Sequence, residues 1–595
     1  MTSKKILVLF SIAVMAFFLF SFTKRTEKKA PLSPIGMVVL EGSYLIACQS
    51  AKMVVSVDKE NGEVINSVGF DLPLTGITNH GEKIYVTSSW SASKVHELNI
   101  DLEPLREAEA GFGSCSPIVS PDGNTLYVAN QFTNDITFFD TKSLKKIAVV
   151  KAGRQPRGID ISPDGKWLFA ANLLPSTRAD RDTVASDVSI IDTENQKLVK
   201  SIALANGSNA LRGIKISPDG MYAFISHNLG RFQFPTTQLE KGWMNTSALS
   251  IINVNKKEYV ATVLLDEPMR GAAGSWGIDC DHENIYVAHS GTHDFSVIGY
   301  KELMDKVNET TDKKTLSYNL TFLSDIRQRI KVSGNGPRAI KQSGQELIVA
   351  SYFSDQLSIY DKSEWNKTTA REISLNPALF EDSVRIGERV FHDAQYCFQS
   401  WQACTGCHPD NARVDGLNWD LLNDGIGNPK NCKSMILSHL TPPSMITGIR
   451  ESAELAVRAG FRHIQLTQID EGNARAVDLY LSSLQPVPSP FLIKGKLSPK
   501  AKKGEQLFKS LACVNCHPGP YYTDLNKHRI GTPGEYDQND TWDTPTLIEC
   551  WRTGPWLHDG RSATMRDVYI NEKHGIDVDL SDVEIDQLTE YVLSL

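Results

Sequence analysis

The sequence has no long run of basic residues. Its formal net charge of −8 is spread along 595 residues, so charge gives no support to nucleic-acid binding. Beyond the N-terminus it also lacks any apolar stretch long enough to cross a membrane. Cysteine and histidine are scarce, with 10 and 14 residues, so a short motif built from both would seldom arise by chance. What remains is the composition of an ordinary soluble globular protein, long enough for several domains.

The N-terminal residues 1–30 differ from the rest of the chain. Lys4 and Lys5 precede an apolar run from Ile6 to Phe22, and Lys24 and Arg25 follow it. This order predicts a secretory signal peptide or, if the segment is not cleaved, an N-terminal membrane anchor. In both cases we expect the remainder of the chain outside the cytoplasm, in the periplasm or at the cell surface.

A repeat occupies residues 34–375. The string Ser-Pro-Asp-Gly occurs at Ser120–Gly123, Ser162–Gly165 and Ser217–Gly220, and each copy precedes an apolar strand pattern. Proline fixes one dihedral angle of such a turn and glycine accepts a positive φ. Weaker copies extend the series to seven units of about 40 residues, which predicts a seven-bladed β-propeller. We expect insertions near Thr177–Ala185, Gly230–Ser247 and Lys301–Lys331. Segments such as Leu126–Asn130 resemble the YVTN family of seven-bladed propellers, which implies the same fold.

A second, different duplication follows. Gly387–Phe391 and Gly504–Phe508 have similar sequences, as do Tyr480–Leu484 and Tyr591–Leu595, and the periodicity is helical. Ser581 followed by Glu584 predicts a capped start for the last helix. These patterns predict two tandem all-α cytochrome c modules at residues 378–490 and 491–595, so the whole chain is expected to be a multidomain protein.

Each predicted module contains one Cys-x-x-Cys-His motif. The motifs are Cys404–His408 and Cys513–His517, whereas chance predicts about 0.004 such strings in this composition. The two thiols of each motif, Cys404 with Cys407 and Cys513 with Cys516, can attach a haem covalently, and His408 or His517 then becomes the proximal iron ligand. A zinc ribbon would place its Cys pairs about 15–20 residues apart and would not explain the histidine after each pair. We therefore predict two haem c groups.

The C-terminal part resembles the diheme cytochrome c peroxidase family. The resemblance covers residues 378–595 and is carried by Gly504–His517, Thr544–Leu547 and Leu557–Met565. It implies that His408 serves a peroxidatic haem and that His517 serves the haem at which electrons enter. It also implies Ca²⁺ between the modules, for which only Thr544-Pro545 matches, and a tryptophan relay between the haems. Trp401 could be that relay or a core aromatic residue.

The distal haem ligands stay open at the level of sequence. The family's methionine position in the second module holds Glu572, so His574 is the preferred distal ligand and Met565 the alternative. A solvated loop position would also account for His574. In the first module Thr441–Met445 and Gly448–Glu451 replace the family's catalytic loop. Arg450 and Glu451 are the candidate catalytic residues there, with Glu451 as the candidate acid–base group, and a surface ion pair would equally explain them.

Two further expectations concern the other residues. Arg157, Arg212 and Arg338 occupy equivalent positions of the propeller repeat and would form part of a ring around its axis. The ring could bind an anionic ligand or haem propionates, or its arginines could simply bridge neighbouring blades. Since an oxidising compartment permits disulfides, Cys397 could pair with Cys432 near the first haem.

Three hypotheses about function follow. The first is an exported diheme oxidoreductase of the peroxidase type, in which electrons from a donor protein or small redox molecule enter at the second haem and reduce a substrate at the first. The second is a non-catalytic electron-transfer cytochrome. The third is a propeller binding module with auxiliary haems.

Overall fold

The computed structural model describes residues 29–89, 93–233, 244–367, 369–421, 428–535, 537–538 and 540–595. The predicted signal peptide or anchor lies outside this range, except for its last two residues. Across the described ranges, no helix combines the length and the apolar character needed to span a membrane.

Strands β1 to β28 form seven four-stranded antiparallel sheets, and each sheet consists of four consecutive strands. Their bounds are β1 Pro34–Val39, β2 Ser43–Cys48, β3 Met53–Asp58, β4 Val64–Gly69; β5 Leu74–His80, β6 Lys83–Ser88, β7 Lys94–Asn99, β8 Pro104–Glu109; β9 Ser114–Val119, β10 Thr125–Asn130, β11 Asp135–Asp140, β12 Lys146–Lys151; β13 Pro156–Ile161, β14 Trp167–Asn172, β15 Asp187–Asp192, β16 Lys197–Ala203; β17 Ser208–Ile216, β18 Tyr222–Gly230, β19 Asn245–Asn253, β20 Glu258–Leu264; β21 Ser275–Cys280, β22 Asn284–His289, β23 Asp294–Gly299, β24 Arg327–Lys331; and β25 Pro337–Ser343, β26 Glu346–Ser351, β27 Gln356–Asp361, β28 Arg371–Ser374.

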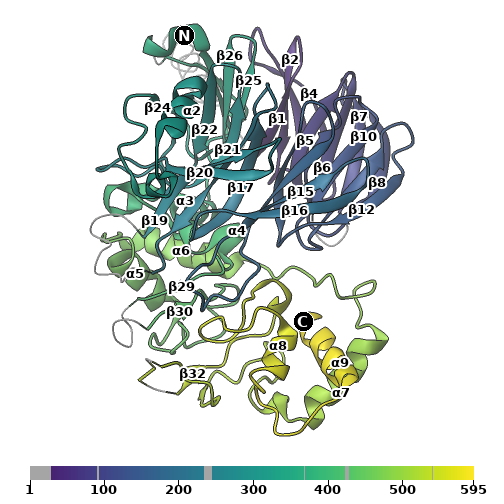
Figure 1. Ribbon diagram of the computed structural model, residues 1–595, viewed down its shortest axis with the longest axis vertical. Coiled ribbons are helices and arrows are strands. Elements are labelled where there is room, and N and C mark those ends of the chain that lie inside the picture. Colours follow the sequence, from purple (N-terminus) through teal and green to yellow (C-terminus); the bar gives the residue numbers. More distant parts are fainter. Residues whose placement is uncertain are drawn as a thin grey trace, which may run out of the picture.

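The first strand of each sheet contacts the first strands of both neighbouring sheets, and β1 contacts β25, so the ring is closed. This is the predicted seven-bladed β-propeller (Figure 1). The buried Asp355 strengthens the closure, because its carboxylate accepts hydrogen bonds from the backbone amides of Leu32 and Ser33 and from the Asn376 side chain, at 2.8–3.0 Å. Residues before the first blade and after the last are thereby tied to the seventh blade.

The Ser-Pro-Asp-Gly turns connect the first two strands of three blades. In the first copy the Ser120 hydroxyl donates to the Asp122 carboxylate at 2.5 Å and accepts from the Thr125 amide at 3.0 Å, while Gly123 has a φ of +74°. The other two copies repeat the serine–aspartate bond at the same distance. Local turn chemistry therefore sets the position of each following strand.

The predicted insertion at residues 301–331 is shorter than expected, because its end belongs to a strand of the propeller. Residues 301–331 contain most of helix α2 (Tyr300–Glu309) and all of the 3₁₀ helix η2 (Lys313–Tyr318), but their last five residues are β24, the outer strand of the sixth blade. Of the expected insertion between β18 and β19, residues 234–243 lie outside the described residues.

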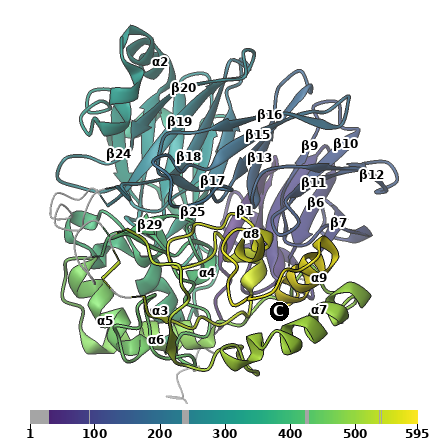
Figure 2. The ribbon, with the colours of Figure 1, turned by 60° about the horizontal axis from the view of Figure 1, so that its bottom comes forward.

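Helices dominate the chain after Ser383. They are α3 Ser383–His392, η4 Ala394–Tyr396, η5 Phe398–Ser400, η6 Cys404–Gly406, α4 Pro409–Ala412, α5 Ala453–His463, α6 Glu471–Ser483, α7 Pro499–Ser510, η7 Cys513–Asn515, η8 Cys550–Arg552, α8 Met565–Ile570 and α9 Asp582–Leu593. Two small sheets lie among these helices: β29 (Asn418–Trp419) pairs with β30 (Lys430–Asn431), and β31 (Lys527–His528) pairs with β32 (Trp542–Asp543). The region was expected to be all-helical, and these sheets show that it is not. Figure 2 shows these helices together on one side of the propeller.

The duplication of helical segments has a structural counterpart. A Cβ atom on Gly387 of α3 would overlap the Ala476 carbonyl of α6, and one on Gly504 of α7 would overlap the Gln587 carbonyl of α9. Tyr480 and Tyr591 are the next neighbours at the two crossings. The two helix pairs therefore approach each other in the same way, which only glycine permits. Ser581 and Glu584 form the predicted capping box at the start of α9.

We expect Gly387→Ala and Gly504→Ala each to lower the free energy of unfolding by about 1–3 kcal/mol, since each added methyl group forces two helices apart. Gly69→Ala is the control, because a Cβ atom on this exposed glycine at the end of β4 would meet no other group within 4 Å. That change should alter the stability by less than about 1 kcal/mol. Denaturation midpoints followed by circular dichroism check this, and equal midpoints for all three variants would contradict the close crossings.

Candidate haem sites

The two motif histidines have the same local geometry. The Nδ1 atom of His408 lies 3.2 Å from the Arg413 carbonyl oxygen, and Nδ1 of His517 lies 2.9 Å from the Tyr522 carbonyl oxygen, in each case five residues downstream. An Nδ1–H that donates to a carbonyl fixes the ring and leaves Nε2 unprotonated. Burial lowers the pKa of His408 to about 4. Both imidazoles are thus held neutral and oriented, as a proximal iron ligand requires.

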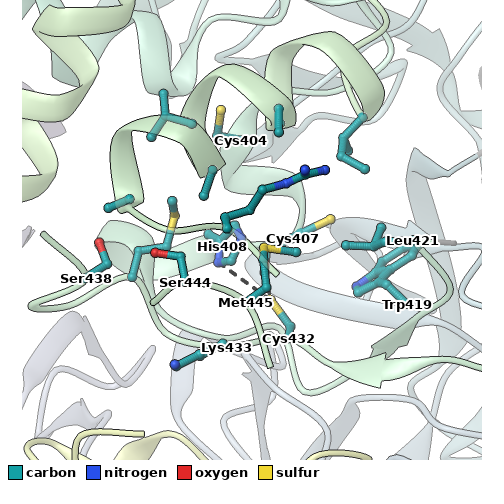
Figure 3. A pocket seen from close by; sticks show the side chains of 18 of the residues that line it. Cys404, Cys407, His408, Trp419, Leu421, Cys432, Lys433, Ser438, Ser444 and Met445 are labelled. Atoms are coloured by element: carbon teal, nitrogen blue, oxygen red, sulfur yellow. Dashed lines mark hydrogen bonds between the residues drawn. The ribbon is translucent and has the colours of Figure 1, made fainter. Parts of the chain in front are cut away.

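A cavity of about 530 Å³ adjoins the first motif. Cys404, Cys407 and His408 all line it, and Figure 3 shows these side chains around one space. Burial raises the pKa of the Cys404 thiol to about 12 and also raises that of Cys407, so both thiols are protonated and apolar in character. A large, mostly apolar space beside two thiols and an oriented imidazole fits a covalently held haem.

The propeller contributes to this first site. Met244, next to β19, lines the cavity, and the Asn245 side-chain nitrogen lies 3.2 Å from the Cys407 sulfur. The backbone directly after the motif is left-handed at Asp410, Asn411 and Ala412, with φ of 54°, 59° and 67°. Three such residues in succession are costly and persist only when surrounding contacts hold them.

The second motif lies beside His574. Its Nδ1 atom is buried without a hydrogen-bond partner among the described residues. Burial, followed by the nearby His517, lowers the pKa of His574 to about 4. A neutral imidazole with an unused buried nitrogen close to the proximal histidine fits a distal ligand. Met565, by contrast, is packed in an apolar cluster with Phe508 and Leu588.

Of the other predicted site residues of the first module, Arg450 lines the first cavity and Glu451 and Trp401 do not. Arg450 lines it, whereas Glu451 is solvent-exposed and is not among the lining residues. Trp401 is buried and donates from Nε1 to the Gln399 side chain at 3.0 Å. Its backbone lies next to Gly271 of the propeller, and it does not line the cavity.

Sequence reasoning overlooked several residues of this cavity. Met435 and Met445 supply thioethers, and Ser444 and Thr447 supply buried hydroxyls that have no partner in the described part of the chain. No motif marks these positions, because they come together only through folding.

The disulfide considered between Cys397 and Cys432 is not formed, since both are free thiols in the structure. Instead, the Cys432 sulfur lies 3.0 Å from the Cys407 carbonyl oxygen and 3.6 Å from His408 Nδ1, and Cys432 lines the cavity (Figure 3).

One short segment connects the two sites. Trp542 and Asp543 form β32; the Asp543 amide donates to the Ile446 carbonyl at the first cavity, at 3.0 Å. Three residues later Thr546 lines that same cavity. At the second site, burial lowers the pKa of His517, and the carbonyls of Tyr522 and Pro545 partly oppose that shift. Adjacent residues 545 and 546 therefore face different sites.

The predicted Ca²⁺ site gains no support from side chains. Within the described ranges, no group of three or more His, Cys, Asp or Glu residues is placed to hold a metal ion. The Thr544 carbonyl accepts a hydrogen bond from the Thr523 hydroxyl at 2.7 Å. Calcium stays a prediction.

Comparisons with known proteins agree with the propeller fold. The model of the Lactonase family, 7-bladed β-propeller, matches residues 102–177. The chain is 26% identical over 272 residues to hydrazine synthase subunit gamma of Kuenenia stuttgartiensis, a match that covers 36% of this chain and 77% of that protein. It is 36% identical over 75 residues to dihydro-heme d1 dehydrogenase of Pseudomonas aeruginosa, covering 13% of this chain and 15% of that protein.

A solved structure of Kuenenia stuttgartiensis hydrazine synthase has a similar fold. The TM-score is 0.51 at 23% identity, and the similarity covers 57% of this chain and 98% of that chain. These findings indicate a propeller-containing protein, and the printed name of one relative over a short stretch of the chain refers to haem d1.

We expect His574→Ala to convert the second haem from low spin to high spin, because the variant removes the imidazole that best fits the distal position. Met565→Ala is the matched control, and it should lower stability by about 2–5 kcal/mol without changing the spin state. Electron paramagnetic resonance and absorption spectra of the ferric proteins distinguish the two. A spin change with Met565→Ala alone would assign the ligand to Met565.

Proposed function

We propose that this chain is an exported diheme c-type cytochrome of the peroxidase type, which reduces a substrate at the first haem with electrons that enter at the second. The observation that carries the proposal is the repeated motif geometry, in which His408 and His517 are oriented by carbonyls at the same sequence offset in two similar helical settings. The propeller fold agrees with the matching family model, and the name of one relative, dihydro-heme d1 dehydrogenase, is in keeping with a haem protein.

In the proposed protein, Cys404 and Cys407 hold the first haem and Cys513 and Cys516 hold the second. When bound, haem supplies an iron centre that can exchange electrons and coordinate a substrate. The chain supplies two oriented imidazoles, a largely apolar cavity that limits water, and a distal imidazole from His574 at the second site only. An iron with two imidazoles suits electron entry, and an iron without a strong sixth ligand suits substrate binding.

The segment from Trp542 to Thr546 supports electron passage between the sites. Because Pro545 adjoins His517 and Thr546 lines the first cavity, one peptide unit separates the second site's proximal ligand from the first cavity. Trp542 stacks on His558 with ring centroids 4.0 Å apart, next to this segment. We assign the connection between the haems to this segment rather than to Trp401.

The polar groups of the first cavity can bind and orient a small substrate. Ser444 and Thr447 present unpartnered hydroxyls in the described part of the chain, and Arg450 presents a cationic donor at the cavity wall. A guanidinium beside the reacting centre stabilises negative charge that develops on a departing oxygen. The proposal therefore gives this role to Arg450, and Glu451, which faces solvent, is its natural control.

A specific observation favours the electron-carrier alternative. Met435 and Met445 line the first cavity together with His408. A thioether that coordinates the first iron would leave no position for a substrate. Both irons would then be six-coordinate, and the protein would only transfer electrons.

The haem assignment is tested by covalent haem content. The wild-type protein should retain two haems through acid–acetone extraction, because thioether bonds survive that treatment. Changing Cys404 and Cys407 to Ala should remove one haem, and changing Cys513 and Cys516 should remove the other. Cys397→Ala is the control and should retain both. Pyridine haemochrome spectra provide the measurement, and bound zinc without haem would refute the assignment.

The peroxidase assignment is tested at the first cavity. With the second haem reduced, hydrogen peroxide should reoxidise it, and Arg450→Gln should slow that reaction by about 10²-fold. Glu451→Gln should change it less than about twofold, because a solvent-exposed carboxylate is too far from the reacting centre to act on it. Stopped-flow absorption measures the rates. If neither peroxide nor cyanide perturbs the first haem in any redox state, and Met445→Ala restores cyanide binding, the electron-carrier alternative holds.

A further inference from the structure

The propeller carries a half-ring of arginines at its axis. In the first, second, fourth, fifth and seventh blades, the first strand has a bulge where it pairs with the end of the second strand. A bulge changes the direction of the side chain that it contains. The bulges of the fourth, fifth and seventh blades contain Arg157, Arg212 and Arg338, and the register shift in the sixth contains Trp276. In the first and second blades the residues are Ile35 and Thr75. Positive charge thus gathers on one side of the axis.

Arg212 and Arg338 both face the Trp276 ring. Their guanidinium carbons lie 4.7 and 4.2 Å from its centroid, and Arg338 also lies 3.6 Å from the Tyr352 ring. The two arginines are only 9% and 5% exposed. Aromatic packing holds the planar groups in place but satisfies none of their N–H donors.

Several of those donors have no acceptor. Nη1 of Arg212 and both Nε and Nη2 of Arg338 are buried without a hydrogen-bond partner among the described residues. Arg157 is different, since its Nη1 donates to the Gln131 side chain at 2.7 Å. Burial of an unpaired charged donor destabilises the folded protein by several kcal/mol. A bound acceptor would therefore stabilise these positions.

The surrounding charges do not provide one. Burial and, after it, repulsion from Arg338 and Arg157 lower the pKa of Arg212 to about 9. The nearby carboxylates are already engaged: Glu388 accepts from Arg385 and from Tyr352. Asp410 accepts from Arg552 and Gln131. The half-ring therefore keeps excess positive charge.

These observations do not favour simple bridging of blades, because bridging arginines would donate to carbonyls or carboxylates of the next blade. We propose instead that Arg157, Arg212 and Arg338 form a binding site for one small anion with paired oxygens, a carboxylate or inorganic oxyanion. Guanidinium groups match such oxygens in a bidentate manner. The anion comes either from solution or from a propionate of the first haem; only the second source rests on the proposed function.

The test uses the full-length holoprotein, exchanged into a buffer of large organic ions. Isothermal titration with acetate, nitrate and inorganic phosphate should detect one site per chain. Arg212→Gln and Arg338→Gln should each weaken binding by about tenfold or more, as loss of a charged hydrogen-bond donor does. Arg231→Gln is the matched control and should bind as the wild type does, because Arg231 is equally buried but donates to the Ser317 carbonyl and packs on Tyr318.

A propionate source gives a different result. No added anion would then bind the wild type, and Arg338→Gln, but not Arg231→Gln, would shift the midpoint potential of one haem. If a glutamine variant does not fold, Arg338→Lys replaces it, because lysine keeps the charge but lacks the planar guanidinium that donates two parallel hydrogen bonds. This variant should still show the weakened anion binding or the shifted midpoint potential. Absence of both effects overturns the site. If the protein holds no haem, the titration still decides the solution-anion case on its own.

Discussion

The carboxylate of Asp410 is the point at which three parts of the chain meet. It lies two residues after the first proximal histidine, accepts a hydrogen bond from Gln131 of the propeller at 2.7 Å, and pairs with Arg552 of η8 in the second half. Close by, Arg413 forms a bidentate pair with Glu549, at 2.7 and 2.9 Å, with both side chains buried. Loss of one member of such a buried pair costs about 3–5 kcal/mol. The left-handed backbone at residues 410–412 depends on these contacts.

This arrangement ties the orientation of His408 to the whole molecule. The carbonyl that fixes its ring belongs to Arg413, whose guanidinium is held by Glu549 of the second half. The propeller adds Met244 and Asn245 to the same site. It is therefore a wall of the first site as well as a separate fold, and the half-ring of arginines faces the same junction. Few residues therefore separate the axis of the propeller from the cavity beside His408.

Sequence patterns predicted what depends on local or repeated signals. The Ser-Pro-Asp-Gly turns placed β10, β14 and β18, and the repeated segments predicted two similar helical units, whose glycines lie at equivalent helix crossings. Residues that meet only through tertiary contacts escaped prediction. Cys432 lies against the first motif instead of pairing with Cys397, and Thr546 reaches a cavity formed mostly by residues far earlier in the chain. Glu451, the candidate acid–base group, faces solvent, whereas its neighbour Arg450 lines the cavity, because only the folded backbone decides which of the two points inward.

The contact between Asn245 and the Cys407 sulfur has a consequence for how the protein matures. In the proposed cytochrome, haem has to be attached to the Cys407 sulfur, which lies 3.2 Å from the side-chain nitrogen of Asn245 in the propeller. If haem is attached at Cys404 and Cys407 as proposed, attachment before the two parts dock leaves the Cys407 thiol accessible. The propeller then closes over a cofactor that is already in place.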